Sequence, residues 1–386
     1  MQHSGPPGRG CGGTRARSSA CAAFGAWERC VRHAAGALAL LAALGAPGAA
    51  PVAAAATFDL PADGSNIVGR VQLIRLDNPA NTLLDIARHY DLGYEEIVRA
   101  NPAVSVWVPG AGTRIVVPTE FILPPRPWRG LVVDIPRRRL YYFPAPRRGQ
   151  PAQVITFPIG IARPGWPTPL GSTRIVAKFR NPSWIVPKDI LEEHRREGQA
   201  DFPRYFPPGP GNPMGMLAMQ TGFPGIFIHG TDRPWGVGRR VSHGCMHLYP
   251  EDAAFLFPRL PVGTVVRVVD LPVLVGSRGR QLYVSASMPV ADYASAQSLP
   301  TRAVAALAHW RARHPGLQRQ PMPWQQLLAA ASAQRMMPVP IGAHSGQRDG
   351  RAAAQAPLSY AFPPYGVAAN NAQVPVAPAS GAARGP

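Results

Sequence analysis

The sequence predicts a mostly β protein with a small α/β unit near its N-terminus. From Gly130 onward, short runs rich in Val, Ile, Tyr and Phe alternate with Pro and Gly, a pattern typical of strands joined by turns. Before that point, residues 71–118 hold two helical stretches between two strand-like runs. After about residue 290 the composition shifts to alanine-rich stretches and then to a Pro, Ala, Gly and Ser tail. Because such a tail lacks apolar side chains, we expect residues 291–386 to be partly helical and largely disordered.

The first 56 residues have the features of a secretory leader. Arg29 and Arg32 precede an apolar run at 34–44, and Ala54-Ala55-Ala56 offers a cleavage site. The run is shorter than a membrane-spanning helix needs, although an uncleaved anchor is the competing interpretation. We therefore expect residues 1–56 to be a signal peptide and the rest to be exported. Since the start is rich in Gly, Arg and Ser and has no periodicity, we hypothesise that translation begins at Val31.

The sequence pattern over residues 57–121 predicts a compact α/β unit. In order it contains an extended leading segment, a strand, two helices and a closing strand, at 57–68, 71–76, 83–90, 94–100 and 113–118. Thr82 is placed to cap the first helix, and Asn101-Pro102 ends the second.

This order of elements over residues 71–118 resembles a LysM module, a family that binds the N-acetylated glycan of peptidoglycan or chitin. The sequence departs from the family at Ala80-Asn81-Thr82-Leu83, where Gly-Asp-Thr-Leu is usual. A small packing unit that binds nothing is the alternative. The proline-rich run 121–128 reads as a stiff linker, so we expect the unit to be removable without loss of the chemistry described below.

Residues 129–270 predict a second, mostly β domain, followed by an extension at 271–290. The predicted strands lie at 131–135, 139–143, 153–161, 172–179, 225–229 and 264–269. Helices are predicted at 188–196 and 250–257 within the domain, and at 301–314 and 324–336 after it.

One cysteine, Cys245, remains once the leader is set aside, and it lies in Ser242-His243-Gly244-Cys245. An exported protein with a single thiol cannot use it for an internal disulfide, so the thiol is a candidate nucleophile. Its reference pKa of about 8.5 means that a neighbouring base or positive field is needed to activate it. Gly244 allows close approach of a substrate, and the amides of Gly244 and Cys245 are candidate oxyanion donors. Ser242 and His243 are candidates for supporting hydrogen bonds.

Two histidines compete for the role of general base. His243 is local, but side chains at i and i+2 of an extended segment share a face without pairing directly. His229 ends an apolar strand and is followed by Gly230, so it can approach from an adjacent strand. We favour His229 as the base and the Gly230 carbonyl as the acceptor that orients its ring.

Residues 129–270 resemble the YkuD-type L,D-transpeptidase catalytic domain. The resemblance rests on several blocks in a fixed order: 157–161, 168–171, 181–184, 212–215, 228–231, 238–245, 251–252 and 261–264. It implies a β-sandwich-like mixed sheet with few helices. Together with the LysM-like unit it points to the enterobacterial-type branch of the family, and hence to the periplasm.

The resemblance implies a cysteine acyl-enzyme mechanism without a cofactor. The thiolate attacks the amide after the third residue of a peptidoglycan tetrapeptide stem, and D-Ala leaves. The acceptor of the thioester stays open. An amine of a second stem gives a 3→3 cross-link, a lysine of an outer-membrane lipoprotein tethers that membrane to the wall, and water makes the enzyme an L,D-carboxypeptidase. Carbapenems are expected as covalent inhibitors.

The chain departs from the family two positions after the cysteine, where His247 replaces the usual arginine. An arginine clamps a carboxylate with two parallel bonds and a histidine cannot. We expect His247, Arg239 or Arg240 to meet the substrate carboxylate, with Met214 also in the substrate site. As a partial cation near pH 6.5, His247 is expected to favour binding at low pH.

Other interpretations remain open. Cys245 as a buried structural thiol is one, and a wall-binding protein whose catalytic domain has decayed is another. Zinc held by His229, His243, Cys245 and His247 is a third, but no standard zinc spacing accompanies them, so we expect no metal. The formal charge of +19 is almost all arginine and favours polyanions, although compositional bias gives the same excess. No basic stripe interleaved with aromatics is present, so nucleic acid is not an expected partner.

Overall fold

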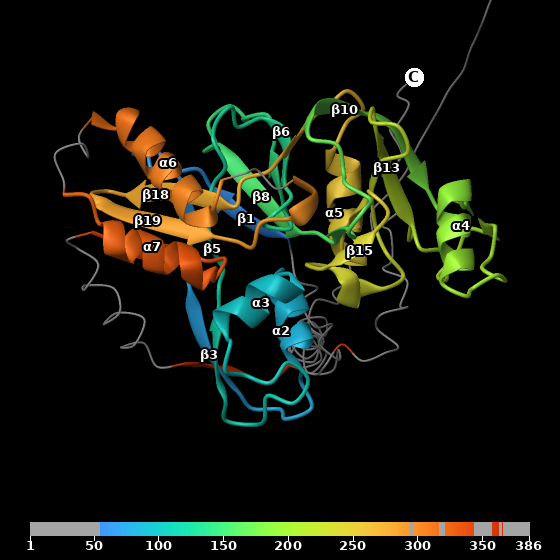
Figure 1. The fold of residues 1–386 in the computed structure, drawn as a ribbon, viewed down its shortest axis with the longest axis horizontal. Coiled ribbons are helices and arrows are strands. Elements are labelled where there is room, and N and C mark those ends of the chain that lie inside the picture. Colours follow the sequence, from blue (N-terminus) through green and yellow to red (C-terminus); the bar gives the residue numbers. More distant parts are fainter. Residues whose placement is uncertain (1–54, 294–296, 316–320, 343–356, 363–364, 366–386) are drawn as a thin grey trace, which may run out of the picture. The chain divides into compact units, whose positions relative to one another are not determined.

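A computed structural model of the chain describes residues 55–293, 297–315, 321–342, 357–362 and 365. Most of the predicted leader and much of the predicted tail therefore lie outside the described residues. The predicted fold class is confirmed, because the described part is mostly β and is built on a mixed, curled sheet (Figure 1). Among the described residues, no helix has the length and apolar character to cross a membrane.

The main sheet has nine strands in the described part of the chain. Their order is β1 (Ala56–Asp59), β8 (Gln153–Pro158), β7 (Arg139–Phe143), β6 (Gly130–Asp134), β17 (Val265–Val269), β10 (Gly171–Arg180), β13 (Leu217–Thr221), β14 (Phe227–His229) and β16 (Met246–His247). Neighbours are antiparallel except β6 with β17 and β14 with β16. β10 pairs with β17 through its first half and, after a bulge, with β13 through its second half, which curls the sheet.

One face of this sheet carries the core of the second predicted domain. Helix α5 (Pro250–Arg259) packs there through Ala253, Leu256 and Phe257, against apolar side chains of the central strands. The central strands β6, β7 and β8 are buried on both faces, so their second face also requires a cover.

The N-terminal unit supplies that cover. It contains β2 (Ile67–Gly69), β3 (Gln72–Leu76), α2 (Leu83–His89), α3 (Tyr94–Ala100), β4 (Arg114–Val117) and β5 (Glu120–Ile122). The predicted strand, two helices and closing strand are present in order. Thr82 caps α2 as predicted: its Oγ1 accepts from the Asp85 amide at 3.2 Å, while the Asp85 carboxylate accepts from the Thr82 amide at 2.8 Å.

The structure differs from the expectation of a separable unit on a stiff linker. One hydrophobic cluster joins helices α2 and α3 to Tyr141, Phe143 and Val154 of the main sheet. Strand β1, predicted only as part of an extended leading segment, pairs with β8 as the edge of that sheet. Removing residues 57–120 would therefore expose one face of the catalytic sheet to water, because the two units share a core.

A third packed group follows the catalytic domain, where the sequence predicts only an extension and a tail. It consists of β18 (Val273–Arg278), β19 (Gln281–Ala286), α6 (Leu299–Ala312), α7 (Trp324–Ala333) and β20 (Val339–Ile341). Both predicted helices are present, and they cover a three-stranded sheet through a separate hydrophobic cluster. The helices are alanine-rich because small side chains let them pack closely together and on the sheet.

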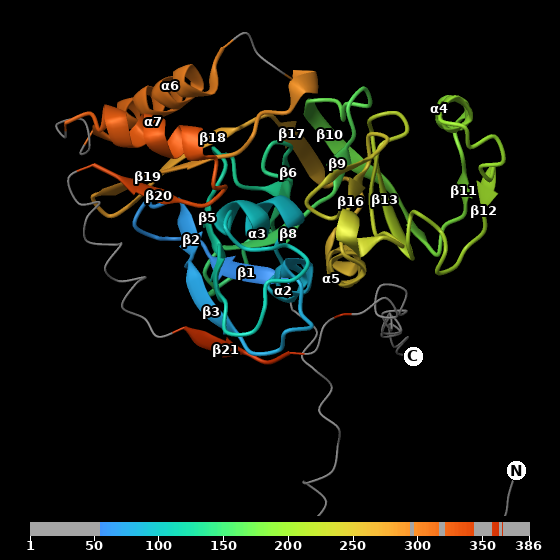
Figure 2. The same ribbon diagram turned by 60° about the horizontal axis from the view of Figure 1, so that its bottom comes forward.

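A short piece of the predicted tail, β21 (Leu358–Tyr360), pairs in parallel with β3 of the N-terminal unit (Figure 2). Tyr360 is fully buried there. Its ring lies 5.3 Å from that of His89 and 6.0 Å from that of Tyr90.

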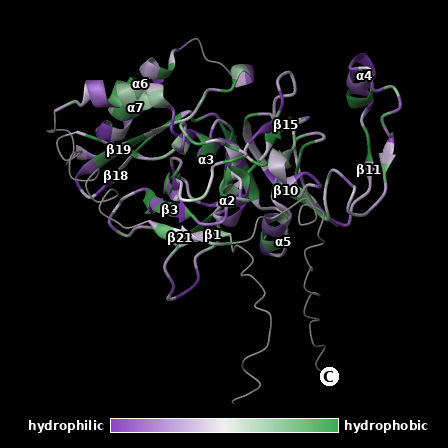
Figure 3. Ribbon diagram, turned by 90° about the horizontal axis from the view of Figure 1, so that it is seen from below, coloured by the Kyte–Doolittle hydropathy of each residue, from purple (hydrophilic) through white to green (hydrophobic). Residues whose placement is uncertain are grey.

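Several short elements lie around the candidate active site. They are β9 (Ile161–Ala162), β11 (Trp184–Ile185), α4 (Lys188–Arg196), β12 (Tyr205–Phe206), the 3₁₀ turns η1 (Pro234–Gly236) and η2 (Ala291–Tyr293), and β15 (Arg240–Ser242). Elements β11, α4 and β12 form an excursion that stands apart from the main sheet in Figures 1 and 2. Helix α4 is largely hydrophilic in Figure 3 and buries Ile190 alone among its residues.

Candidate active site

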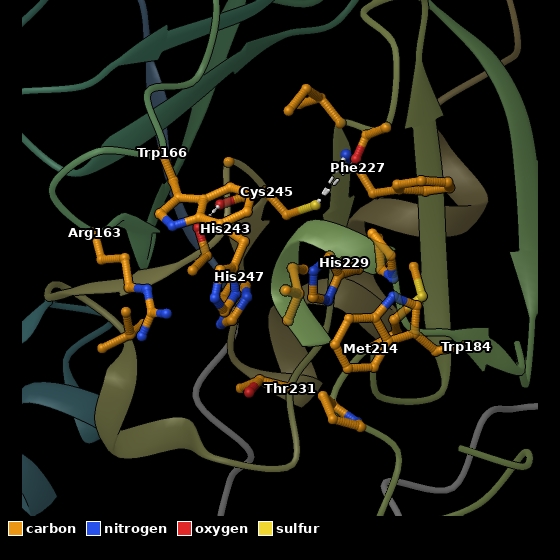
Figure 4. A pocket seen from close by; sticks show the side chains of 18 of the residues that line it. Arg163, Trp166, Trp184, Met214, Phe227, His229, Thr231, His243, Cys245 and His247 are labelled. Atoms are coloured by element: carbon orange, nitrogen blue, oxygen red, sulfur yellow. Dashed lines mark hydrogen bonds between the residues drawn. The ribbon is translucent and has the colours of Figure 1, made fainter. Parts of the chain in front are cut away.

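Cys245 lies in the tight connection between β15 and β16. Gly244 before it has φ of +108°, a conformation that L side chains rarely adopt, and a Cβ there would lie 2.7 Å from Ile226 Cδ1. The sulfur points to strand β14 (Figure 4). It accepts a hydrogen bond from the Phe227 amide at 3.4 Å and lies 3.6 Å from the Gly225 carbonyl oxygen.

His229 is two residues further along the same strand, so its side chain shares a face with that of Phe227. The ring is buried, and Nδ1 lies 2.6 Å from the Gly230 carbonyl oxygen. A carbonyl oxygen can only accept, so Nδ1 carries the proton and Nε2 keeps a lone pair. The contact between His229 and Gly230 that the sequence predicts is thus present, and it sets the ring in the tautomer of a base.

Burial shifts the pKa values of the thiol and the imidazole apart. Burial raises the pKa of Cys245 to about 11, although the hydrogen bond from the Phe227 amide acts to lower it. Burial lowers the pKa of His229 to about 4, although the carbonyls of Gly230 and Met214 act to raise it by favouring the protonated ring. At neutral pH the Cys245 thiol and the His229 imidazole are therefore both uncharged at rest, and not a thiolate and an imidazolium.

This resting state predicts how Cys245 reacts with iodoacetamide. Only the thiolate reacts, and below a pKa of about 11 its fraction rises tenfold with each pH unit. Between pH 7 and pH 9.5 we expect the alkylation rate of Cys245 to rise about 300-fold without a plateau. Peptide-resolved mass spectrometry of the full chain measures it. A plateau already reached at pH 7 would show a stable thiolate and contradict the uncharged resting state.

Two hydroxyl groups hold the backbone around the nucleophile. Thr168 Oγ1 donates to the Gly244 carbonyl at 2.7 Å, and Ser242 Oγ donates to the Cys245 carbonyl at 2.5 Å. The carbonyl of Gly244 and the amide of Cys245 belong to one trans peptide and point in opposite directions. Thr168 therefore fixes the direction of the Cys245 amide, one of the predicted oxyanion donors. The sequence placed Ser242 in a supporting role but assigned none to Thr168.

His243 is held by the α4 excursion. Its Nε2 lies 2.8 Å from Glu193 Oε2, and its ring meets that of Trp166 edge-on at 4.8 Å. Glu193 also accepts from Trp166 Nε1 at 3.0 Å and pairs with Arg163. Burial alone would raise the pKa of Glu193, but the hydrogen bonds from Arg163, Trp166 and His243 lower it to about 2. His243 therefore belongs to the wall of the site and is not turned to the thiol as a base.

His247 lies in register with His229 across β14 and β16, and the two ring centroids are 4.6 Å apart. Burial, with His229 and His243 nearby, holds the pKa of His247 well below its ordinary value. Burial therefore disfavours the charged ring that a pH-dependent contact with a carboxylate needs. Among the described residues, no three His, Cys, Asp or Glu side chains converge as metal ligands would.

The two predicted substrate arginines point in different directions. Arg239 stacks over the Tyr94 ring of the N-terminal unit at 4.6 Å and does not line the cavity beside Cys245. Arg240 lines it, donates to the Ala162 carbonyl at 3.0 Å and pairs with Asp292. Arg233, which the sequence gave no signal for, also lines it, with 70% of its side chain exposed and Asp232 3.7 Å away.

The cavity that joins these groups has a volume of about 1230 Å³. Cys245, His229, His243, His247 and Met214 all line it (Figure 4). Aromatic and apolar side chains make up much of its wall, among them Trp166, Phe179, Trp184, Phe206, Phe227 and Trp235. A long, largely apolar cleft with a thiol and a base at one point suits an extended substrate with one reacting bond.

Comparison with known proteins is consistent with this arrangement. Residues 129–268 match the YkuD family, described as the L,D-transpeptidase catalytic domain. The chain is 38% identical over 234 residues to the "Probable L,D-transpeptidase YbiS" of Escherichia coli, which covers 60% of this chain and 74% of that protein. It is 36% identical over 253 residues to the "Probable L,D-transpeptidase ErfK/SrfK" of Salmonella typhimurium, 64% of this chain and 80% of that protein. It is 25% identical over 217 residues to "L,D-transpeptidase 1" of Mycobacterium tuberculosis, 55% and 76% of the two chains.

Proposed function

The chain belongs to the L,D-transpeptidase family of enzymes, and on that premise we propose that Cys245 forms an acyl-enzyme with the tetrapeptide stem of peptidoglycan. The observation that carries the proposal is the placement of the sulfur against the Phe227 amide, on the strand where His229 holds an unprotonated Nε2. Nucleophile and base line one cavity large enough for an extended peptide.

The proposed reaction has two steps, acylation of Cys245 and transfer of the acyl group to an acceptor. As the sulfur attacks the carbonyl carbon of the third stem residue, its proton passes to His229 Nε2. The oxyanion is met by the amides of Gly244 and Cys245, the latter fixed through Thr168. The C–N bond then breaks, the amine of D-Ala takes the proton from Nε2, and a thioester remains. An acceptor amine then attacks the thioester carbon and loses a proton to Nε2. The new C–N bond forms, the C–S bond breaks, and the sulfur takes the proton back from Nε2 as the thiol.

His229 rests uncharged, so its Nε2 is free to accept a proton throughout the physiological range. A pKa of about 4 makes it a weak base for a thiol, so the sulfur proton can reach Nε2 only while the sulfur attacks. Once protonated, it is a strong acid for the departing amine. The same low pKa means that the proton stays on the ring only while the developing oxyanion is nearby, so transfer accompanies attack.

The N-terminal unit is our proposed glycan contact. Its order of strand, two helices and strand matches the LysM-like expectation. Trp107, 60% exposed in the loop between α3 and β4, offers an aromatic face of the kind that packs against sugar rings. Sedimentation of the protein with intact sacculi measures this binding.

We further propose residues 129–270 as the catalytic domain, export to the periplasm by the leader at 1–56, and a lipoprotein lysine as one acceptor.

Incubation with purified muropeptides, followed by mass spectrometry, tests the proposed reaction. A 3→3 cross-linked dimer with release of D-Ala supports transpeptidation, and a lysine-linked product with an added lipoprotein supports tethering. Release of D-Ala with a free tripeptide indicates the L,D-carboxypeptidase alternative. No release of D-Ala from a folded protein would favour the decayed, binding-only alternative and overturn the acyl-enzyme proposal.

Arg233 is our proposed partner for a stem carboxylate. Of the three arginines that line the cavity, Arg163 and Arg240 are each joined closely to a buried or half-buried carboxylate, whereas Arg233 extends into solvent. We expect Arg233→Gln to raise KM about fivefold and to leave kcat within about twofold, since an exposed pair contributes modestly. Steady-state release of D-Ala measures both constants.

Two controls define the Arg233 effect. Arg195→Gln removes an exposed arginine of α4 that does not line the cavity, and should leave KM unchanged. A stem whose free carboxylates are amidated should bind wild type and Arg233→Gln equally. If Arg233→Gln matches wild type on the charged stem, Arg240 becomes the better candidate.

A further inference from the structure

The segment that carries the nucleophile, residues 237–252, contains little regular structure of its own. Strands β15 and β16 within it have three and two residues. Short strands hold their position only weakly unless something outside them does so. One stretch of the N-terminal unit, the α2–α3 junction (residues 88–94), contacts this nucleophile segment at both ends.

At the upstream end, backbone meets backbone. The Tyr94 amide donates to the Val237 carbonyl at 3.1 Å, and the Tyr94 ring lies under the Arg239 guanidinium. Gly93 and Gly238 touch so closely that a Cβ on Gly93 would lie 2.8 Å from Gly238 Cα. No side chain larger than hydrogen fits between them without moving one of the two chains.

At the downstream end, polar groups of the junction hold the start of α5. Arg88 binds Glu251 through two bonds of 2.7 and 2.9 Å, and both side chains are nearly buried. The Tyr249 hydroxyl donates to the Leu92 carbonyl at 3.1 Å. Asp91 and Asp252 are both buried, and burial raises the pKa of both carboxyl groups, which favours their protonated forms.

We infer that the α2–α3 junction is a positioning element for the nucleophile: by clamping residues 237–239 and 249–252 together, it keeps Cys245 Sγ at the Phe227 amide beside His229. The inference rests on the proposed function for its catalytic meaning, and on these contacts alone for its geometry. It gives the N-terminal unit a part in the chemistry that is separate from any binding of glycan.

Gly93→Ala tests the upstream clamp. The φ of Gly93 is −88°, so alanine suits the backbone, and the new methyl group acts only by pushing Gly238 away. We expect kcat for D-Ala release to fall about tenfold or more, with KM within about twofold, because reacting groups tolerate little misplacement. Alkylation of Cys245 by iodoacetamide at pH 8 should change in the opposite sense. A half-buried thiol that moves toward water has a pKa nearer its ordinary value, so we expect that rate to rise at least about threefold.

Arg88→Gln tests the downstream clamp by an independent change. It should give the same pair of opposite effects, slower turnover and faster alkylation. Glu95→Gln and Arg99→Gln are the matched controls. They remove an ion pair of 2.7 Å on the same unit that does not contact residues 237–252, and both rates should stay at wild-type values.

The two readouts also separate this inference from the proposed function. If Gly93→Ala and Arg88→Gln lower the melting temperature but leave turnover and alkylation at wild-type values, the junction only stabilises the fold and the inference is overturned. If wild type releases no D-Ala while both variants still alkylate faster, the clamp stands and the proposed function fails.

Discussion

Cys245→Ser is expected to lower the release of D-Ala from tetrapeptide stems by at least about a thousandfold. A serine hydroxyl has a far higher pKa than a thiol, and His229, with a pKa of about 4, is too weak a base to remove its proton. The site therefore depends on the intrinsic nucleophilicity of sulfur rather than on strong base assistance. Mass spectrometry of muropeptide products measures the loss, and an unchanged circular dichroism spectrum shows that the variant is folded.

Covalent labelling of Cys245 by an inhibitor tests the same mechanism without requiring turnover. A carbapenem is expected to add its mass to the wild-type chain at Cys245, and not to Cys245→Ala or Cys245→Ser. Turnover of Cys245→Ser within a few-fold of wild type, or carbapenem addition to Cys245→Ala, would remove the acyl-enzyme mechanism.

The nucleophile and its base could be proposed from sequence because their signals are local. A lone thiol after glycine, and a histidine at the end of an apolar strand, each mark a position where a reactive group reaches a cleft. The partners that tune the site carry no such signal. Glu193 meets His243 from the α4 excursion, across a separation of 50 residues, and only the fold brings them together.

The arginines show why side-chain direction is hard to predict. Arg239 and Arg240 are adjacent, so on an extended chain they point to opposite sides, and only one lines the cavity. Which one does so depends on the register of β15 with β9, and no spacing in the sequence fixes that register.

The hydrophobic pattern predicts the helices and many of the strands, but it does not predict β13, β18 or β19, nor how the elements assemble. Three successive arginines, 137–139, are all buried, although an arginine is rarely buried unless it is paired. Arg137 bonds to Ser285 of the third packed group, and Arg139 bonds to Glu96 of the N-terminal unit. The hairpin between β6 and β7 thus joins three groups that the sequence presents as separate. The partner of a buried charge is seen only in three dimensions. The sequence therefore predicts separate units joined by a proline-rich linker, although the units are joined by these ion pairs and hydrogen bonds.

Glu96→Leu is expected to destabilise the whole described fold, and not only the N-terminal unit, because of that joint. Arg139 is 1% exposed, and its guanidinium binds Glu96 through two bonds of 2.7 and 2.6 Å. Its other partners are the Thr156 hydroxyl at 2.7 Å and the Asp91 carbonyl at 3.0 Å, neither of which carries charge. Without Glu96 a buried cation loses its neutralising carboxylate, which typically costs about 3–5 kcal/mol.

Urea unfolding followed by tryptophan fluorescence measures this loss as a lower midpoint. Glu95→Gln, on the neighbouring position of α3, breaks a half-exposed pair with Arg99 and should change the free energy of unfolding by less than about 1 kcal/mol. The double variant Glu96→Leu with Arg139→Met removes both charges and should recover most of the stability, since a buried ion pair and an apolar pair of similar volume are often equivalent. If Glu96→Leu instead unfolds the N-terminal unit in a separate early transition, with the catalytic sheet unaffected, the two units do not share one core. A single shifted transition would show that the N-terminal unit and the main sheet fold together, as the clamp on the nucleophile segment requires.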